Sequence, residues 1–160
     1  MLASMLSAML KMAANMANSL AKARLEQQLS RTHIALGLAG LIPFVGLAIA
    51  RQMTDLPALW QLGYASLIFS FLGGILWSQS LKRSAPKHTS WVAIAVMLWA
   101  WCWLIFDSFN WLLPAGLSFI VLWLYERRYL SDLYPQGFIK LRCLLSMIAA
   151  TSLCLSAVQW

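Results

Sequence analysis

Charge is scarce in this sequence of 160 residues, and acidic residues are the scarcest of all. Asp, Glu, Lys and Arg make up only 11% of the chain, and 5 of its residues are Asp or Glu. Soluble domains carry about 25% charged residues, because a small domain exposes much of its surface to water. Since 61% of the residues are hydrophobic, the composition excludes an ordinary soluble domain, and we predict an integral membrane protein.

Side chains that carry catalysis or bind metals are equally rare. The 2 histidines, His33 and His88, fall at the start of an apolar run and in a connection, without metal-binding partners at a suitable spacing. The five carboxylates all map to connections or to the ends of apolar runs, whereas proton and ion pathways need an ionisable group at mid-membrane depth. We therefore predict no catalytic residue, no cofactor and no metal, in a protein that is not an enzyme.

Cysteine is also sparse, with residues only at Cys102, Cys143 and Cys154. All three lie inside apolar runs and none forms a C-x-x-C pair, which is typical of small buried hydrophobic residues. Cys102 and Cys154 are expected at a similar depth toward one membrane face, so the sequence leaves open whether they pair.

Five apolar runs are present, each near the length of about 20 residues that a helix needs to cross a bilayer. They cover approximately residues 34–50, 58–79, 90–106, 111–125 and 141–158. Lipid offers no partner to open backbone groups, and period-2 alternation is absent, so we predict an all-α protein with five transmembrane helices. Because the connection 107–110 is short, the third and fourth helices should be antiparallel neighbours, with Asp107, Ser108 or Asn110 capping the fourth.

Basic residues separate to one side of the predicted helices. All but one of the 12 Lys and Arg residues precede the first run, lie in the second and fourth connections, or lie just inside the fifth run; the exception is Arg51. Cytoplasmic connections carry an excess of Lys and Arg, so we predict the N-terminus inside and the C-terminus, at Trp160, outside. The bacterial inner membrane is the expected location, with the mitochondrial inner membrane as the alternative. Nucleic acid is not an expected partner, because the basic residues are not interleaved with aromatic residues on one face.

The segment 1–32 differs in pattern from the five-helix domain 33–160. Its apolar and polar side chains fall on opposite helical stripes, which predicts an amphipathic helix lying in the membrane interface. An organellar transit peptide and a start codon assigned too early are the alternatives.

Small residues mark the predicted helix contacts. Ser66, Ser70 and Gly74 recur every four residues in the second helix, and such a stripe lets another backbone approach closely. In the first helix, Pro43 removes a backbone hydrogen bond and should cause a kink. We predict that the first two helices pack together, or that the stripe faces a second protomer; the residues concerned are Gly37, Gly40, Pro43, Ser66, Ser70 and Gly74.

A charged cluster surrounds the last connection and comprises Glu126, Arg127, Arg128, Lys140 and Arg142. It is the candidate contact for an anionic lipid headgroup or for an acidic loop of a partner. The alternative is structural: Glu126 pairs with a neighbouring base, while Lys140 and Arg142 extend toward the interface.

Three segments resemble a known family. They are G-L-A-G-L-I-P-F at 37–44, Y-A-S-L-I-F-S-F-L-G-G-I-L-W at 64–77, and Y-E-R-R at 125–128 followed by K-L-R at 140–142. Together they resemble the small bacterial membrane proteins of an uncharacterised family that also contains a mitochondrial transmembrane protein. The resemblance covers roughly 34–158 and implies a protein of about five helices; it implies no activity, substrate or catalytic residue.

These features predict a polytopic inner-membrane protein that acts as a non-enzymatic scaffold, accessory subunit or assembly partner in a membrane complex. The expected partners are the lipid bilayer and other membrane proteins, or further copies of the chain. The alternative is a small transport or permeation protein that acts as a homo-oligomer, with Ser66 and Ser70 lining its path. A third reading is a membrane enzyme that acts on lipid at the charged cluster.

Overall fold

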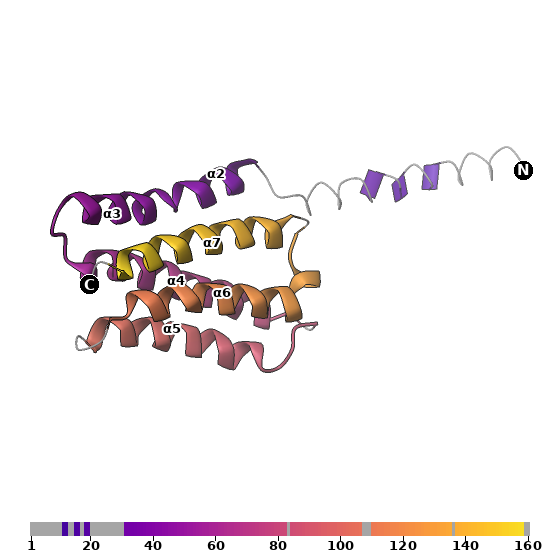
Figure 1. Cartoon of the computed structure of the whole chain (residues 1–160). Coiled ribbons are helices and arrows are strands. Elements are labelled where there is room, and N and C mark those ends of the chain that lie inside the picture. Colours follow the sequence, from indigo (N-terminus) through magenta and orange to yellow (C-terminus); the bar gives the residue numbers. More distant parts are fainter. Residues whose placement is uncertain are drawn as a thin grey trace, which may run out of the picture.

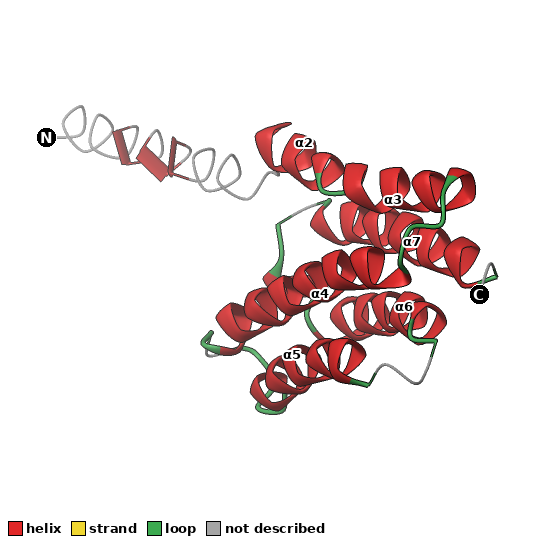
Figure 2. Ribbon diagram, turned by 90° about the vertical axis from the view of Figure 1, so that its left-hand side faces the viewer, coloured by secondary structure: helices red, strands yellow, loops and turns green. Residues whose placement is uncertain are grey.

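The protein is a bundle of α-helices in a computed structural model (Figure 1, Figure 2). The structure describes residues 31–82, 84–106, 110–135 and 137–158, and in addition the helical residues Lys11, Met12, Asn15, Met16, Asn18 and Ser19. The predicted amphipathic helix therefore lies mostly outside the described residues, as do Asp107, Ser108 and Trp160. Within the described ranges all regular structure is helical: α2 (Arg31–Ala39), α3 (Ile42–Met53), α4 (Ala58–Ser80), α5 (Thr89–Ile105), α6 (Leu112–Tyr129), the 3-10 helix η1 (Ser131–Leu133) and α7 (Phe138–Ala157).

The predicted first helix is present as two helices, α2 and α3, which follow one another along one edge of the bundle (Figure 1). The break falls at Gly40 and Leu41, and Pro43 lies in the first turn of α3, where its missing N–H costs little. The carbonyl of Gly40 accepts a hydrogen bond of 2.7 Å from the Tyr64 hydroxyl of α4. The expected kink is therefore a full break, and a side chain of α4 satisfies a backbone group at the break.

Among the residues that the structure describes, three parts are long and apolar enough to cross a membrane: the 31–53 segment formed by α2 and α3, then α4, and α7. Helix α5 is apolar but shorter. Helix α6 continues beyond its predicted end at Tyr125 to Tyr129, so Glu126, Arg127 and Arg128 lie in its last turn. This extension brings Glu126 onto the packed face of a helix.

Two helix pairs approach closely at glycines. A Cβ added at Gly73 of α4 would lie 3.0 Å from the Ala93 carbonyl oxygen of α5, and one at Gly116 of α6 would lie 3.1 Å from the Ala150 carbonyl oxygen of α7. Small residues at such points let helix backbones come together. Helices α5 and α6 contact each other through longer side chains, since the Trp99 indole N–H donates to Ser118 Oγ at 2.9 Å.

An aromatic cluster forms the centre of the bundle and joins α3, α4, α5 and α6. Phe44, Phe69, Trp103 and Phe119 are all buried. The ring centroid of Phe69 lies 5.1 Å from that of Phe119 and 4.9 Å from that of Trp103. The ring centroid of Phe44 lies 5.7 Å from that of Phe119. Tilted and edge-on contacts at these distances are favourable. The cluster holds the helices around the site described next.

Candidate functional site

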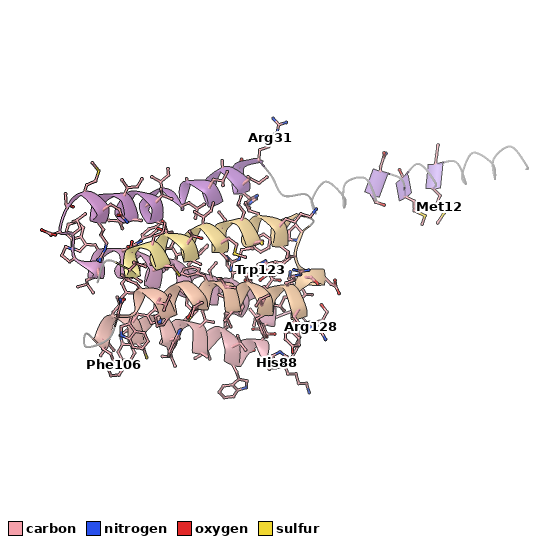
Figure 3. All side chains as sticks on the ribbon, viewed as in Figure 1. Met12, Arg31, His88, Phe106, Trp123 and Arg128 are labelled. Atoms are coloured by element: carbon pink, nitrogen blue, oxygen red, sulfur yellow. The ribbon has the colours of Figure 1, made fainter. Side chains whose placement is uncertain are left out.

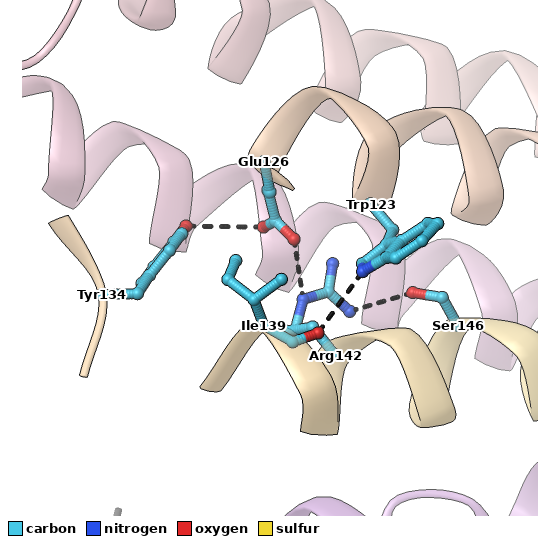
Figure 4. A network of polar contacts seen from close by, with 6 residues as sticks. All are labelled: Trp123, Glu126, Tyr134, Ile139, Arg142 and Ser146. Atoms are coloured by element: carbon cyan, nitrogen blue, oxygen red, sulfur yellow. Dashed lines mark hydrogen bonds and ion pairs between the residues drawn. The ribbon is translucent and has the colours of Figure 1, made fainter. Parts of the chain in front are cut away.

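A buried ion pair joins α6 to α7 at one end of the bundle. Glu126 is 0% exposed and Arg142 is 4% exposed. The Arg142 Nε–H donates to Glu126 Oε2 at 2.9 Å (Figure 4). Of the predicted charged cluster, these two residues meet inside the bundle, and Arg142 points inward instead of extending toward the interface.

The helical period places both charges in the seam between α6 and α7. Glu126 follows Phe119 and Leu122 at helical spacing on the buried face of α6. Arg142 begins the buried face of α7, which continues through Ser146 and Leu153. Residues three and four apart share one face of a helix, so the two charged side chains face the same packed interface.

Neighbouring side chains satisfy most of the remaining polar atoms of the pair. The Tyr134 hydroxyl donates to Glu126 Oε1 at 3.4 Å, and Arg142 Nη1 donates to Ser146 Oγ at 3.4 Å. Beside them, the Trp123 indole N–H donates to the Ile139 carbonyl at 3.3 Å (Figure 4). Burial, and next the charge of Glu126, raise the pKa of Tyr134 above its ordinary value. Its hydroxyl is therefore protonated and donates a hydrogen bond, as in the contact with Glu126.

Two buried polar atoms nearby have no hydrogen-bond partner in the part of the chain that the structure describes. They are Arg142 Nη2 and Gln79 Oε1. An unpaired donor on a buried charged group is costly, so the position of Arg142 Nη2 needs an explanation beyond the ion pair.

Arg142 and Gln79 line a cavity of about 570 Å³, here called the groove, between α2, α3, α4 and α7. Its polar lining residues are His33, Gln79, Tyr134 and Arg142. The other lining residues are apolar side chains or glycines: Leu36, Gly37, Gly40, Leu41, Phe44, Ile68, Phe71, Leu72, Ile75, Phe119, Pro135, Phe138, Leu141, Leu145 and Ala149. Because α2 begins, α4 ends and α7 begins beside the polar residues, one end of the groove is polar and the other reaches the aromatic cluster at Phe44 and Phe119. Pockets that hold small ligands have volumes of about 300–1,000 Å³.

The other three residues of the charged cluster lie on the surface. Arg127, Arg128 and Lys140 are exposed. Arg127 stacks over the Trp123 ring at 5.5 Å, and Arg128 lies 6.0 Å from the centre of the Tyr129 ring. The structure therefore separates the cluster into an inward-facing pair and an outward-facing basic surface.

The predicted packing residues lie at several different contacts. Gly37 faces Leu145 of α7, while Gly40 contacts Tyr64 through its carbonyl. Ser66 is buried and Ser70 partly buried on α4. An added Cβ at Gly74 would meet only Met97 of α5, at 3.9 Å, so the neighbouring Gly73 makes the closer approach to that helix.

A second polar cluster, which the sequence analysis missed, caps the opposite end of α7. Gln61 Nε2 donates to Ser152 Oγ at 3.2 Å, and Ser152 Oγ donates to the Phe44 carbonyl at 2.7 Å. Arg51 Nη2 donates to the Ser156 carbonyl at 3.5 Å, where a positive charge stabilises the negative end of the helix dipole. This cluster anchors α3 and α4 to α7.

The sequence carried a signal for part of the site. Glu126 continues the helical spacing of the apolar residues before it, so its burial was predictable once α6 was extended by one turn. Tyr134 and Gln79 carry no such signal. Gln79 is far from Arg142 along the chain, and Tyr134 lies in the irregular connection between η1 and α7, where no helical spacing predicts which way its side chain faces.

The remaining candidate ligands are dispersed. Cys102, Cys143 and Cys154 are free and partly buried, so Cys102 and Cys154 are not paired in this structure. Within the described ranges, no three His, Cys, Asp or Glu side chains group closely enough to hold a metal ion.

Comparison with known proteins gives a family match over most of the chain. The family model described as "Protein of unknown function (DUF3429)" matches residues 29–158, which include the groove and the ion pair. Transmembrane protein 69 of Xenopus tropicalis is 32% identical over 127 residues, covering 74% of this chain and 50% of that protein. Transmembrane protein 69 of Mus musculus is 27% identical over 124 residues, covering 72% and 51%. The chain thus spans about half the length of these relatives, and no solved structure matches it.

Proposed function

The chain belongs to the DUF3429 family of proteins of unknown function, and on that premise we propose that it is a non-enzymatic accessory or assembly subunit of a larger membrane complex. Its apolar helices and its similarity to proteins named transmembrane protein 69 support a location in the membrane. The proposed location is the bacterial inner membrane, with the mitochondrial inner membrane as the alternative.

We propose five crossings, with α2 and α3 acting together as the first. Arg31, His88 and Arg128 lie at one end of the bundle and Phe106 at the other (Figure 3). Lys82 reaches the same end as Arg128, because its Nζ donates to the Leu133 carbonyl of η1. This distribution of basic residues supports an orientation with that end in the cytoplasm.

The observation that carries the proposed role is the exposure of the α2–α3 segment. In the most apolar stretch of this segment 17% of the residues are buried inside the protein, whereas in that of α4 44% are buried. Ala35, Ala39 and Gly46 are exposed on it, and a Cβ added at Gly46 would meet nothing within 4 Å. Small residues are the contact points of membrane helices, so this surface suits a transmembrane helix of a partner protein.

The ion pair supports a binding or structural role over a catalytic one. The Glu126 carboxylate accepts hydrogen bonds from Arg142 at one oxygen and from Tyr134 at the other, so both oxygens are already bonded to side chains of the protein. The groove is walled mainly by apolar side chains beyond its polar end, which does not favour the alternative of a path for polar solutes.

Purification of the full-length protein in mild detergent, after cross-linking in membranes, tests the proposal. We expect one membrane protein to be enriched with it, and Gly46→Leu to reduce that enrichment about tenfold, because membrane helix contacts contribute about 1–2 kcal/mol. Ala95→Leu is the matched control, since Ala95 is an exposed small residue on α5. Recovery of the chain alone or only as copies of itself, or equal effects of both variants, contradicts the proposal.

A further inference from the structure

We propose that the groove binds an anionic glycerophospholipid, with the lipid phosphate at Arg142 and an acyl chain along the apolar walls. This site lies on the inner side of α2 and α3, between them and α4 and α7. Ala35, Ala39 and Gly46, the small residues of the proposed partner surface, are not among the residues that line it. The two proposals are therefore independent.

The polar end of the groove offers an unused donor for a phosphate oxygen. Arg142 uses Nε for Glu126 and Nη1 for Ser146, while Nη2 is buried without a partner among the described residues. Guanidinium groups bind phosphate oxygens with strong charge-assisted hydrogen bonds. Glu126 acts here as a positioning residue, because its bond to Nε fixes the plane of the guanidinium.

Charge around this end also suits an anionic headgroup. Arg31, Lys82, Lys87 and Lys140 are exposed there, and Asp132 is an exposed acid on η1. Basic residues at the cytoplasmic face of membrane proteins attract anionic lipids. The free acceptor Gln79 Oε1 suits a headgroup that carries hydroxyl donors, as phosphatidylglycerol does.

The rest of the groove suits a hydrocarbon chain. From Arg142 its walls continue through Leu141 and Leu145 to Phe44 and Phe119, and all four side chains are apolar. A hydrocarbon chain in this position lies against apolar side chains and makes van der Waals contacts along its length.

Lipid has a direct route into the groove from the side. Leu36 of α2 and Phe71 of α4 both line it, yet they are 67% and 65% exposed. Their side chains therefore form an outer rim between α2 and α4 at the surface that faces the acyl chains of the bilayer. A lipid can enter between these two helices without crossing the bundle.

Native mass spectrometry of the full-length protein, titrated with phosphatidylglycerol in mild detergent, tests the site. We expect one lipid to bind to the wild type, and diacylglycerol with the same chains, which lacks the phosphate, to bind about tenfold more weakly. Glycerol 3-phosphate, which lacks the chains, should not compete. Equal binding of diacylglycerol, or full competition by glycerol 3-phosphate, overturns the proposal.

Variants separate the groove from the outer surface. Glu126→Gln with Arg142→Gln removes both charges together, so no buried charge is left alone, and Ile75→Trp fills the groove while leaving the ion pair intact. Both are expected to weaken phosphatidylglycerol binding about tenfold. Arg128→Gln removes an exposed positive charge at the same end and should bind as the wild type does. If Ile75→Trp, like Arg128→Gln, binds phosphatidylglycerol as the wild type does, the lipid lies elsewhere and the proposal is wrong.

Discussion

At the scale of single residues, the burial of the Glu126–Arg142 pair has a large desolvation cost. Two charges leave water together, and their attraction offsets the loss of hydration only when the remaining polar atoms are also bonded. Tyr134 and Ser146 provide such bonds. The free energy of unfolding therefore depends more strongly on keeping both charges of this pair than on keeping both charges of a surface ion pair.

Replacement of Arg142 alone should be severe. We expect Arg142→Ala to lower the free energy of unfolding by about 3–5 kcal/mol, because Glu126 is left buried without its counter-charge. Chemical denaturation in detergent micelles measures the change. Arg128→Ala, at an exposed position, should change it by less than about 0.5 kcal/mol, and equal losses in both variants would show that the pair is not buried as described.

At the scale of helices, two neighbouring glycines on α4 have different environments. Gly73 abuts the backbone of α5 at Ala93, whereas Gly74 has only the flexible end of Met97 within reach. The stripe of small residues predicted the importance of Gly74, and the structure places the tighter contact one residue earlier. The difference is a rotation of about 100° around the helix axis.

The two glycines provide a matched pair of substitutions. Gly73→Ala is expected to destabilise the protein by about 1–3 kcal/mol, because the added methyl group forces α4 and α5 apart. Gly74→Ala should be neutral or stabilising by up to about 1 kcal/mol, since alanine favours the helix more than glycine does. Thermal unfolding in the same detergent compares them, and a larger loss for Gly74→Ala would contradict the described packing of α4 on α5.

At the scale of the whole molecule, the connections alternate between the two ends of the bundle. Arg51 contacts the C-terminal end of α7 through the Ser156 carbonyl, while Lys82 contacts η1 at the opposite end. Thr54 and Ser84, both exposed, therefore lie at opposite ends. The five crossings proposed above would place them on opposite sides of the membrane.

Labelling of single cysteines tests that arrangement. In a background with Cys102, Cys143 and Cys154 replaced by alanine, Thr54→Cys should react with an impermeant maleimide in intact cells, because its connection is expected to face outward. Ser84→Cys and Ser131→Cys should react only after the membrane is opened. Labelling of Thr54→Cys and Ser84→Cys from the same side would contradict the proposed crossings.

Much of the architecture was predictable from local pattern. The helix positions, the break near Pro43 and the grouping of basic residues at alternate connections all follow from hydropathy, proline geometry and charge along the chain. The site was predictable only in part. Glu126 and Arg142 were named as members of a charged cluster, but their burial and their separation from Arg127, Arg128 and Lys140 depend on how α6 and α7 face each other.

The sequence by itself determined that this protein is helical. Its side chains are strongly apolar and suit lipid, and lipid leaves the backbone N–H groups no partner except the carbonyl groups of the chain itself. Only the tertiary structure decided that Arg142, Gln79 and Leu36 surround one groove. These residues lie on α7, α4 and α2, far apart along the chain, and no local force relates them. Side-chain packing between whole helices brings them together, and that packing depends on shape complementarity, which hydropathy does not record.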